Sequence, residues 1–294
     1  MNKKNVLSVL CATVLGLFMV VSCSNEDDST AAPTITLSTN SVEANAGESI
    51  NVSATFTAEA GVTSLTITKL LDGQVDGTPE VRVGLSESGT VSFDYLIAVD
   101  DSDFILKFNF SLLDEEGRSA QTEVVVDVQL SKRQLLLKYN WALNQEIRGL
   151  TGENDITAAY TDDIYRFNED GTFDKSIGAM ADDFSDLWYN YCKWDLNEDT
   201  GKLLMHRTGA FLGNVVDTLN ISVIDKTALE ANVTYYGLDV FNTGSEAVPY
   251  EAVEEYLKKF VAVAKGSNFD PYGSGAADDA GPAGVCNDIT LEND

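Results

Sequence analysis

Apolar and polar residues alternate at every second position through much of the first half of the chain. The clearest alternating rows cover residues 50–56, 104–112 and 124–130. Strict alternation places one row of side chains against a core and the other toward solvent, as in antiparallel sheets. Clusters of turn residues, such as Asp72-Gly73, separate the rows. About seven short strands in roughly 100 residues predict a β-sandwich over residues 33–130.

Alternation returns after a short helix-like stretch that begins at Ser131, whose leucines we expect to cover one end of a barrel. Trp141 opens the first strand, and turns at residues 168–171, 195–201 and 225–227 join the later strands. The Asp-Gly pair in the first of these turns tolerates the positive φ that tight hairpins need. Consecutive strands joined by short turns form an up-and-down meander. Such a sheet has two exposed edge strands, and it removes them best by closing into a barrel. We therefore predict an antiparallel β-barrel over residues 131–245.

One segment has helical periodicity. Residues 251–265 carry an apolar stripe, with glutamates early and lysines late, an order that suits the helix dipole. Pro249 precedes the segment, as is common at a helix start. We expect one C-terminal helix that packs on the barrel, followed by a tail rich in glycine and aspartate, in a region spanning residues 246–294. The predicted fold class is mainly β, with a sandwich, then a barrel, then this helix.

The N-terminus has the organisation of a signal segment. Lys3 and Lys4 precede an apolar run over residues 6–21, which is short for a membrane span of about 20 residues. The run ends at Val20-Val21-Ser22-Cys23, which resembles the lipobox where bacterial signal peptidase II cuts. The resemblance implies that residues 1–22 are removed and that Cys23 carries lipid, with residues 23–32 as an acidic tether. An ordinary secretory signal with a chance cysteine is the alternative.

Two further resemblances concern the domains. Residues 42–47 and 113–120 resemble the strand entries of immunoglobulin-like or PKD-like modules, which usually act as spacers. Residues 163–173, 194–196 and 219–224 resemble lipocalin-like domains of Bacteroides-type surface lipoproteins. That resemblance implies a small barrel with a ligand cavity and Trp194 packed inside. The family has no uniform ligand and no shared catalytic residues, so it implies no site.

The charge restricts the partners. The chain has 47 acidic and 19 basic residues, a formal net charge of −28. Such a surface repels nucleic-acid phosphates and anionic lipid headgroups. A ligand is then expected to be neutral, cationic or bridged by divalent ions, although acidity as a means of solubility explains the composition equally well.

Aromatic residues before Trp194 are the best candidates for ligand contact, because aromatic faces stack on sugar rings and enclose apolar ligands. They are Trp188, Tyr189 and Tyr191. In a regular strand, alternation turns Trp188 and Trp194 to one side and the two tyrosines to the other. We expect Trp194 to pack in the core and Tyr189 and Tyr191 to be at least partly exposed.

Beyond the signal segment and the lipid-bearing Cys23, two cysteines remain, Cys192 and Cys286. In an oxidising compartment they are candidates for a disulfide, the alternative being two buried thiols. Asp28-Ser29-Thr30 resembles the sites at which Bacteroides-type bacteria attach O-glycans, which makes Ser29 a candidate for this modification.

Metal binding and catalysis have little support in the sequence. His206 is the single histidine, so histidine-rich zinc sites are absent. Residues 195–201 begin like a calcium loop, but Thr200 stands where that loop needs glycine. Asp100, Asp101 and Asp103 form either a calcium loop or a solvated acidic turn. We predict no metal, no cofactor and no catalytic residue, and hence a protein that is not an enzyme.

These observations predict a lipid-anchored protein of the outer membrane, facing the cell exterior. Its sandwich would hold the barrel away from the membrane, and the barrel would bind a small hydrophobic molecule or a glycan. The alternative is a non-enzymatic structural or protein-binding subunit of an outer-membrane complex. A hollow barrel would favour the first function, and a barrel filled by side chains the second.

Overall fold

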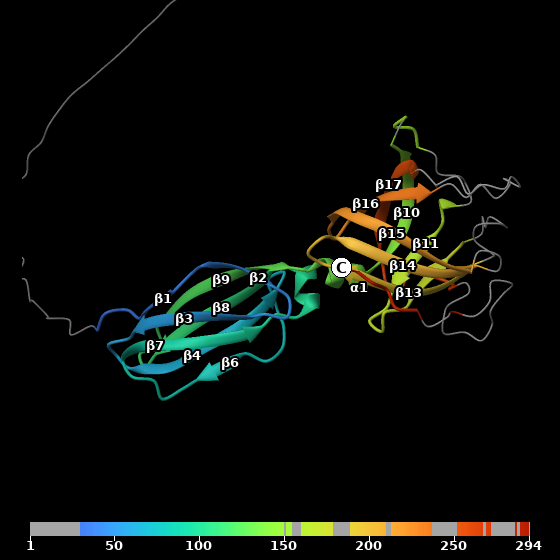
Figure 1. Cartoon of the computed structure of the whole chain (residues 1–294). Coiled ribbons are helices and arrows are strands. Elements are labelled where there is room, and N and C mark those ends of the chain that lie inside the picture. Colours follow the sequence, from blue (N-terminus) through green and yellow to red (C-terminus); the bar gives the residue numbers. More distant parts are fainter. Residues whose placement is uncertain are drawn as a thin grey trace, which may run out of the picture.

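The computed structural model describes residues 30–149, 151–154, 160–178, 189–209, 213–236, 252–266, 269–271, 286 and 289–293. The predicted signal segment, Cys23, Ser29 and Trp188 lie outside these residues. The chain forms two β domains that lie end to end (Figure 1). The predicted mainly β class is therefore confirmed. No helix among the described residues has the length and apolar character needed to cross a membrane.

The first domain consists of two sheets packed on one core. Its smaller sheet has the order β1 (Thr34–Leu37), β3 (Ser49–Thr57), β7 (Ser88–Leu96). The larger sheet has the order β2 (Ser41–Asn45), β9 (Ser119–Gln129), β8 (Leu106–Asp114), β4 (Val62–Leu71), β5 (Gln74–Val75), and β6 (Glu80–Arg82) also pairs with β4. All pairs are antiparallel except β2 with β9.

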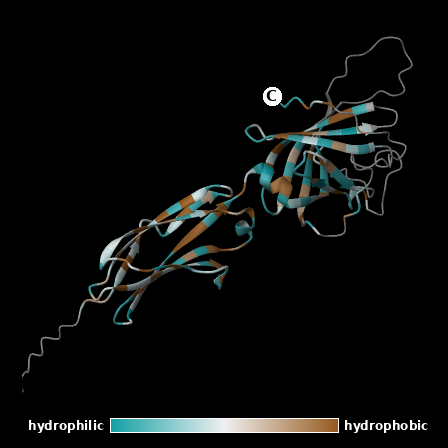
Figure 2. Cartoon of the chain, turned by 90° about the horizontal axis from the view of Figure 1, so that it is seen from below, coloured by the Kyte–Doolittle hydropathy of each residue, from teal (hydrophilic) through white to brown (hydrophobic). Residues whose placement is uncertain are grey.

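The predicted apolar rows form the core of this sandwich, except that Phe104 at the start of the second row is 45% exposed. Hydrophobic and hydrophilic residues alternate along its strands (Figure 2). Phe93 of the smaller sheet packs against Phe108 and Phe110 of the larger one, with ring centroids 4.8 and 5.7 Å apart. Aromatic burial of this kind is a large contribution to the free energy of folding.

The second domain is an eight-stranded antiparallel sheet that nearly closes on itself. Its order is β12 (Phe173–Ser176), β11 (Ile164–Phe167), β10 (Tyr139–Arg148), β17 (Ala252–Ala264), β16 (Ala228–Tyr236), β15 (Gly213–Ile224), β14 (Lys202–Gly209), β13 (Tyr189–Asn197). The two outer strands approach each other at a bridge between Thr172 and Lys193. Gly171, with a φ of 82°, makes the predicted hairpin turn, and its carbonyl accepts a 2.8 Å hydrogen bond from the backbone N–H of Trp194. The predicted barrel is thus confirmed as a nearly closed sheet.

The predicted C-terminal helix is wrong. Residues 252–264 form β17, which lies between β10 and β16 in the middle of the barrel sheet. The lysines that suited a helix terminus instead form cross-strand pairs: Lys259 with Glu230 at 2.9 Å and Lys258 with Glu146 at 3.3 Å. Two ladders of backbone hydrogen bonds outweigh a local helical pattern. The barrel sheet consequently extends beyond residue 245.

The α-helix of the described chain is α1 (Lys132–Lys138), at the start of the second domain. Ser131 and Gln134 form a capping box: the Ser131 hydroxyl accepts from the Gln134 N–H at 3.2 Å, and the Gln134 side chain accepts from the Ser131 N–H at 2.9 Å. Leu135 and Leu136 belong to the barrel core. The helix therefore closes one end of the barrel, as the sequence predicts.

The acidic turn of the sandwich, 3₁₀-helix η1 (Val99–Asp103), contacts the second domain. The Lys138 ammonium lies 2.9 Å from Asp103 and 3.3 Å from Asp100. Lys226 donates to the carbonyl of Ser102. Asp101 is turned inward and pairs with Lys69 at 2.7 Å. Asp101 is therefore buried, whereas Asp100 and Asp103, with side chains 93% and 43% exposed, pair with Lys138 at the surface.

Candidate functional site

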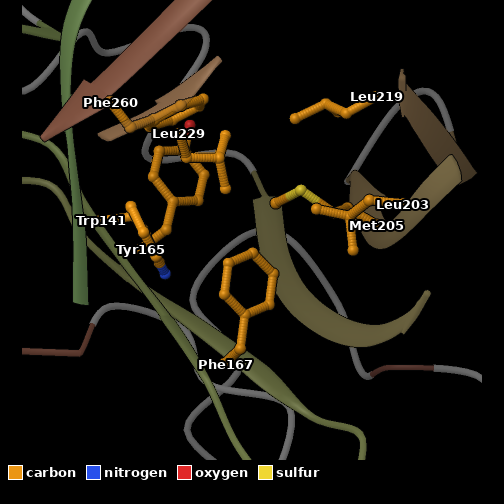
Figure 3. A pocket seen from close by; sticks show the side chains of 8 residues that line it. All are labelled: Trp141, Tyr165, Phe167, Leu203, Met205, Leu219, Leu229 and Phe260. Atoms are coloured by element: carbon orange, nitrogen blue, oxygen red, sulfur yellow. The ribbon is translucent and has the colours of Figure 1, made fainter. Parts of the chain in front are cut away.

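The half of the barrel next to α1 is apolar and almost filled. A cavity of about 10 Å³ remains, roughly the space of one water molecule. Figure 3 shows the side chains that enclose it, which are Trp141, Tyr165, Phe167, Leu203, Met205, Leu219, Leu229 and Phe260. Pockets for drug-sized ligands are typically about 300–1,000 Å³. This half of the barrel is thus packed as a core.

Charged and tyrosine side chains replace the apolar ones farther from α1. On β14 the next inward residue after Met205 is Arg207, and on β15 the next after Leu219 is Asp217. Both moves lead two residues along the strand, away from the helix. The same change from apolar to polar residues occurs on β10, β12 and β17. We call this set the ionic layer; its members are Glu146, Asp163, Lys175, Arg207, Asp217, Lys258, Tyr165, Tyr189 and Tyr191.

Lys175 and Asp163 are the most deeply buried pair of the ionic layer. Their charged groups are 2.7 Å apart, and their side chains are 5% and 0% exposed. The Lys175 ammonium also lies 5.5–5.6 Å from the ring centroids of Tyr160, Tyr165 and Tyr191. A desolvated ammonium needs both an opposite charge and polarisable neighbours, and tyrosine rings provide the latter.

Tyr165 remains protonated in this environment. Burial raises the pKa of its hydroxyl, and this effect exceeds the opposing influence of the nearby Lys175 and Lys258 ammonium groups. The hydroxyl therefore stays a neutral hydrogen-bonding group at physiological pH.

Arg207 and Asp217 form the most accessible strong pair of the ionic layer, with side chains 23% and 25% exposed. Nε and Nη2 of Arg207 both donate to the carboxylate, at 2.7 and 3.2 Å. The guanidinium carbon lies 4.1 Å from the ring centroid of Tyr189. Burial works to lower the pKa of Arg207, but the Asp217 carboxylate outweighs it and holds the pKa above its usual value. The geometry offers donors and acceptors in fixed directions at the edge of the interior.

The two tyrosines proposed as ligand contacts lie inside the barrel, and the expectation of exposed side chains is wrong. Tyr189 and Tyr191 are 8% and 4% exposed and share one core cluster with Trp194. The reason is a β-bulge between Tyr191 and Lys193, where Cys192 has no opposite residue on β14. One inserted residue reverses the alternation, so residues three apart face the same side.

Trp194 packs in the core, as expected. It is 4% exposed, and its indole N–H donates to the carbonyl of Asn168 at 3.0 Å. Trp188, the third proposed contact, lies outside the described residues.

The cysteines meet on the outer face of the barrel. Cys192 and Cys286 form a disulfide with Cα atoms 5.7 Å apart. Farther along the C-terminal segment, Nδ2 of Asn293 donates to the backbone carbonyl of Lys202 at 3.0 Å, and the backbone carbonyl of Asn293 accepts from Nδ2 of Asn197 at 3.3 Å. His206, also on the outer face of β14, is fully buried with Nε2 3.0 Å from the Asn214 amide oxygen.

The ionic layer was not predicted from the sequence. Its pairs join residues that are distant in the chain, such as Glu146 with Lys258. A signal was nevertheless present, because Arg207 and Asp217 continue apolar rows at inward positions. A charged residue at an inward position marks either the place where the strand leaves the core or a charge that is buried inside the barrel.

Fold and site together define a two-domain β protein whose barrel has an apolar base and an ionic layer above it. No family model matches the chain, and no curated protein matches it. Among the solved structures that match is a DUF4466 family protein from Parabacteroides merdae ATCC 43184. Its identity is 11% and its TM-score 0.29, over 81% of this chain and 100% of that one. A likeness at this level carries no argument about this chain.

Proposed function

We propose that the chain is a lipid-anchored binding protein of the bacterial outer membrane, without catalytic activity, whose barrel binds a small polar molecule or a glycan. The single observation that carries the proposal is the ionic layer. Buried ion pairs cost desolvation energy, and well-packed apolar side chains would fill a barrel at least as stably. Charges retained in this position are therefore better explained by recognition of a polar ligand.

The half-buried pair of Arg207 and Asp217 is the part of the ionic layer most suited to ligand contact. It combines a planar donor, a carboxylate acceptor and the neighbouring Tyr189 ring. Such groups match the hydroxyl and amide groups of sugars and similar molecules. The cavity that the described apolar side chains enclose is about 10 Å³, which is too small for a hydrophobic ligand at that place in the barrel.

Binding is tested on the mature chain with an immobilised panel of neutral and acidic oligosaccharides. Arg207→Gln should weaken binding of any hit about tenfold or more, because it removes a charged hydrogen-bonding group. Arg82→Gln is the matched control, since Arg82 pairs with Glu80 on the sandwich. A panel without hits, or a variant that binds like the parent chain, would contradict the proposal.

The anchor is the second part of the proposal. Lipid on Cys23 would hold the chain at the membrane. Asp27 and Asp28, acidic residues just after Cys23, resemble the export signal of such lipoproteins and would direct the chain to the outer face. The Arg118 guanidinium donates to the carbonyls of Thr30 and Ala31 at 2.7 and 3.2 Å. This fixes the entry of the chain at the end of the sandwich away from the barrel (Figure 1). A spacer role for the sandwich fits that arrangement.

The anchor is tested by palmitate labelling and by surface labelling of intact cells. Cys23→Ser should abolish lipid incorporation. Replacing Asp27 and Asp28 by alanine should keep the lipid but lose surface labelling. Lipid incorporation in the serine variant, or unchanged surface labelling in the alanine variant, would argue against the respective part.

The second candidate function is a structural or protein-binding subunit of an outer-membrane complex, which the filled apolar half favours. A blank oligosaccharide panel, together with stoichiometric cross-linking of the barrel to one outer-membrane protein in intact cells, would support this candidate instead.

A further inference from the structure

We propose that the Cys192–Cys286 disulfide is a positioning element: it holds the β-bulge that turns Tyr189 and Tyr191 into the barrel. The proposal rests on the proposed function in so far as the two tyrosines belong to the ligand-binding layer.

The bulge decides which aromatic residues lie inside. Tyr191 is opposite Arg207, and Lys193 is opposite His206, so Cys192 is the inserted residue. Without the insertion, Tyr191 and Trp194 would face opposite sides of the sheet. Since Trp194 is fixed by Asn168 and the core, loss or migration of the bulge would turn the two tyrosines outward.

Among the described residues, β13 has a continuous ladder on one side. It is an outer strand of the sheet, with β14 as its ladder partner among the described residues. On its other side, the described residues include a bridge between Lys193 and Thr172 and a 2.8 Å hydrogen bond from the Trp194 N–H to the Gly171 carbonyl. These contacts involve Lys193 and Trp194, which follow the inserted residue, so they hold the second half of β13 and not the half that carries Tyr189 and Tyr191.

The disulfide acts at the inserted residue itself. The Cys192 side chain is 1% exposed, lies 3.7 Å from the Thr208 hydroxyl on the outer face, and is joined there to Cys286. A cross-link on the outer face keeps Cys192 from rotating inward, and this commits its neighbour Tyr191 to the interior.

The ionic layer depends on this orientation. Tyr191 lies 5.6 Å from the Lys175 ammonium, and Tyr189 lies 4.1 Å from the Arg207 guanidinium. Outward rotation would remove an aromatic ring from each cation. The disulfide on the outside thereby shapes the binding layer on the inside.

The experiment is hydroxyl-radical footprinting by mass spectrometry, which reports the solvent accessibility of individual side chains. It compares the oxidised mature chain, the same folded chain after mild reduction, and the Cys192→Ser/Cys286→Ser variant. Modification of Tyr189 and Tyr191 should rise about threefold or more in the latter two, as expected when buried residues change face. Trp194 and Trp141 should stay protected. Asn293→Ala, which loses the side-chain hydrogen bond from the same segment to Lys202 but keeps the disulfide, is the matched control and should resemble the parent.

Two results would overturn the proposal. Tyrosines that stay protected without the disulfide would show that the bulge holds itself. A parallel rise in the modification of Trp194 and Trp141 would show that the disulfide stabilises the whole barrel and does not position the tyrosines in particular. Neither readout uses a ligand, so the two proposals can fail separately. If no oligosaccharide binds but the tyrosines become accessible without the disulfide, the proposed function is contradicted and the positioning role of the disulfide stands.

Discussion

Lys175 is the residue whose environment is hardest to explain by stability alone. Its ammonium is almost fully removed from water and lies beside the fully buried carboxylate of Asp163. The attraction between such groups offsets their desolvation only when geometry is good, whereas removal of one partner leaves a buried charge. The pair should therefore behave as a unit.

Asp163→Asn should destabilise the barrel by about 3–5 kcal/mol, because Lys175 loses its carboxylate. The double variant Lys175→Met/Asp163→Leu should recover most of that loss. Urea denaturation followed by tryptophan fluorescence reports on the barrel, since all three tryptophans follow residue 140. The control is Lys259→Met, which breaks a more exposed pair with Glu230 in the same barrel and should cost below about 1 kcal/mol. Equal losses in single and double variants would contradict the coupling.

Asp101 gives the sandwich a defined pH dependence. Burial works to raise the pKa of its carboxyl, but hydrogen bonds from Lys69, Tyr95 and the Ala98 N–H outweigh burial and lower it. The folded pKa therefore lies below the unfolded value of about 3.9. The resulting stabilisation is fully present above the unfolded pKa and is lost as pH falls through the folded pKa.

Asp101→Asn should accordingly lower the stability of the sandwich at pH 7 by about 1–3 kcal/mol, because a charged hydrogen-bond acceptor is lost. The difference between parent and variant should shrink as pH falls below about 4. Hydrogen exchange of peptides from β4 and β8, corrected for intrinsic rates, measures both effects. A difference that stays constant from pH 7 to pH 3 would refute the assignment.

At the scale of elements, the sequence pattern correctly predicted the strands and turns that depend on neighbouring residues alone. The sandwich rows and the Asp-Gly turn at Gly171 follow from alternation and from tolerance of positive φ, and both are present. β17 was misread because glutamates followed by lysines suit a helix and equally suit cross-strand pairs. The bulge at Cys192 was invisible, since no glycine or other local signal marks it. The ionic layer depends on contacts between distant strands, which periodicity cannot supply.

The strand character of β17 is open to a direct test. Glu230 and Lys259 are opposite each other on β16 and β17, where Cα atoms about 4.5–5.5 Å apart permit a disulfide. The variant Glu230→Cys/Lys259→Cys should cross-link spontaneously, as shown by peptide mapping of the unreduced chain. Glu230→Cys/Lys265→Cys is the control and should stay reduced. A helix over residues 251–265 would leave the first pair unlinked.

At the scale of the whole molecule, the contact between the domains determines how the barrel is presented. Lys138 and Lys226 of the second domain reach the acidic turn η1 of the first, and the Gln134 side chain donates to the carbonyl of Ala46 at 3.0 Å. Leu130 packs against both cores. Polar and apolar contacts on both sides of α1 favour a rigid connection, which would keep the barrel at a fixed distance from the anchored end of the sandwich.

Lys138→Met/Lys226→Met should loosen this connection while both domains stay folded. Spin labels at the exposed positions Thr55 and Asn232 give the distribution of distances between the domains. The parent should show one narrow distribution, and the variant a broader one. About 1 M salt, which shortens the screening length to about 3 Å, should broaden the parent in the same direction. Lys107→Met should have no effect, because its partner Glu123 lies within the sandwich. A parent distribution as broad as that of the variant would mean that the lysines do not hold the domains, and that the sandwich is a flexible tether.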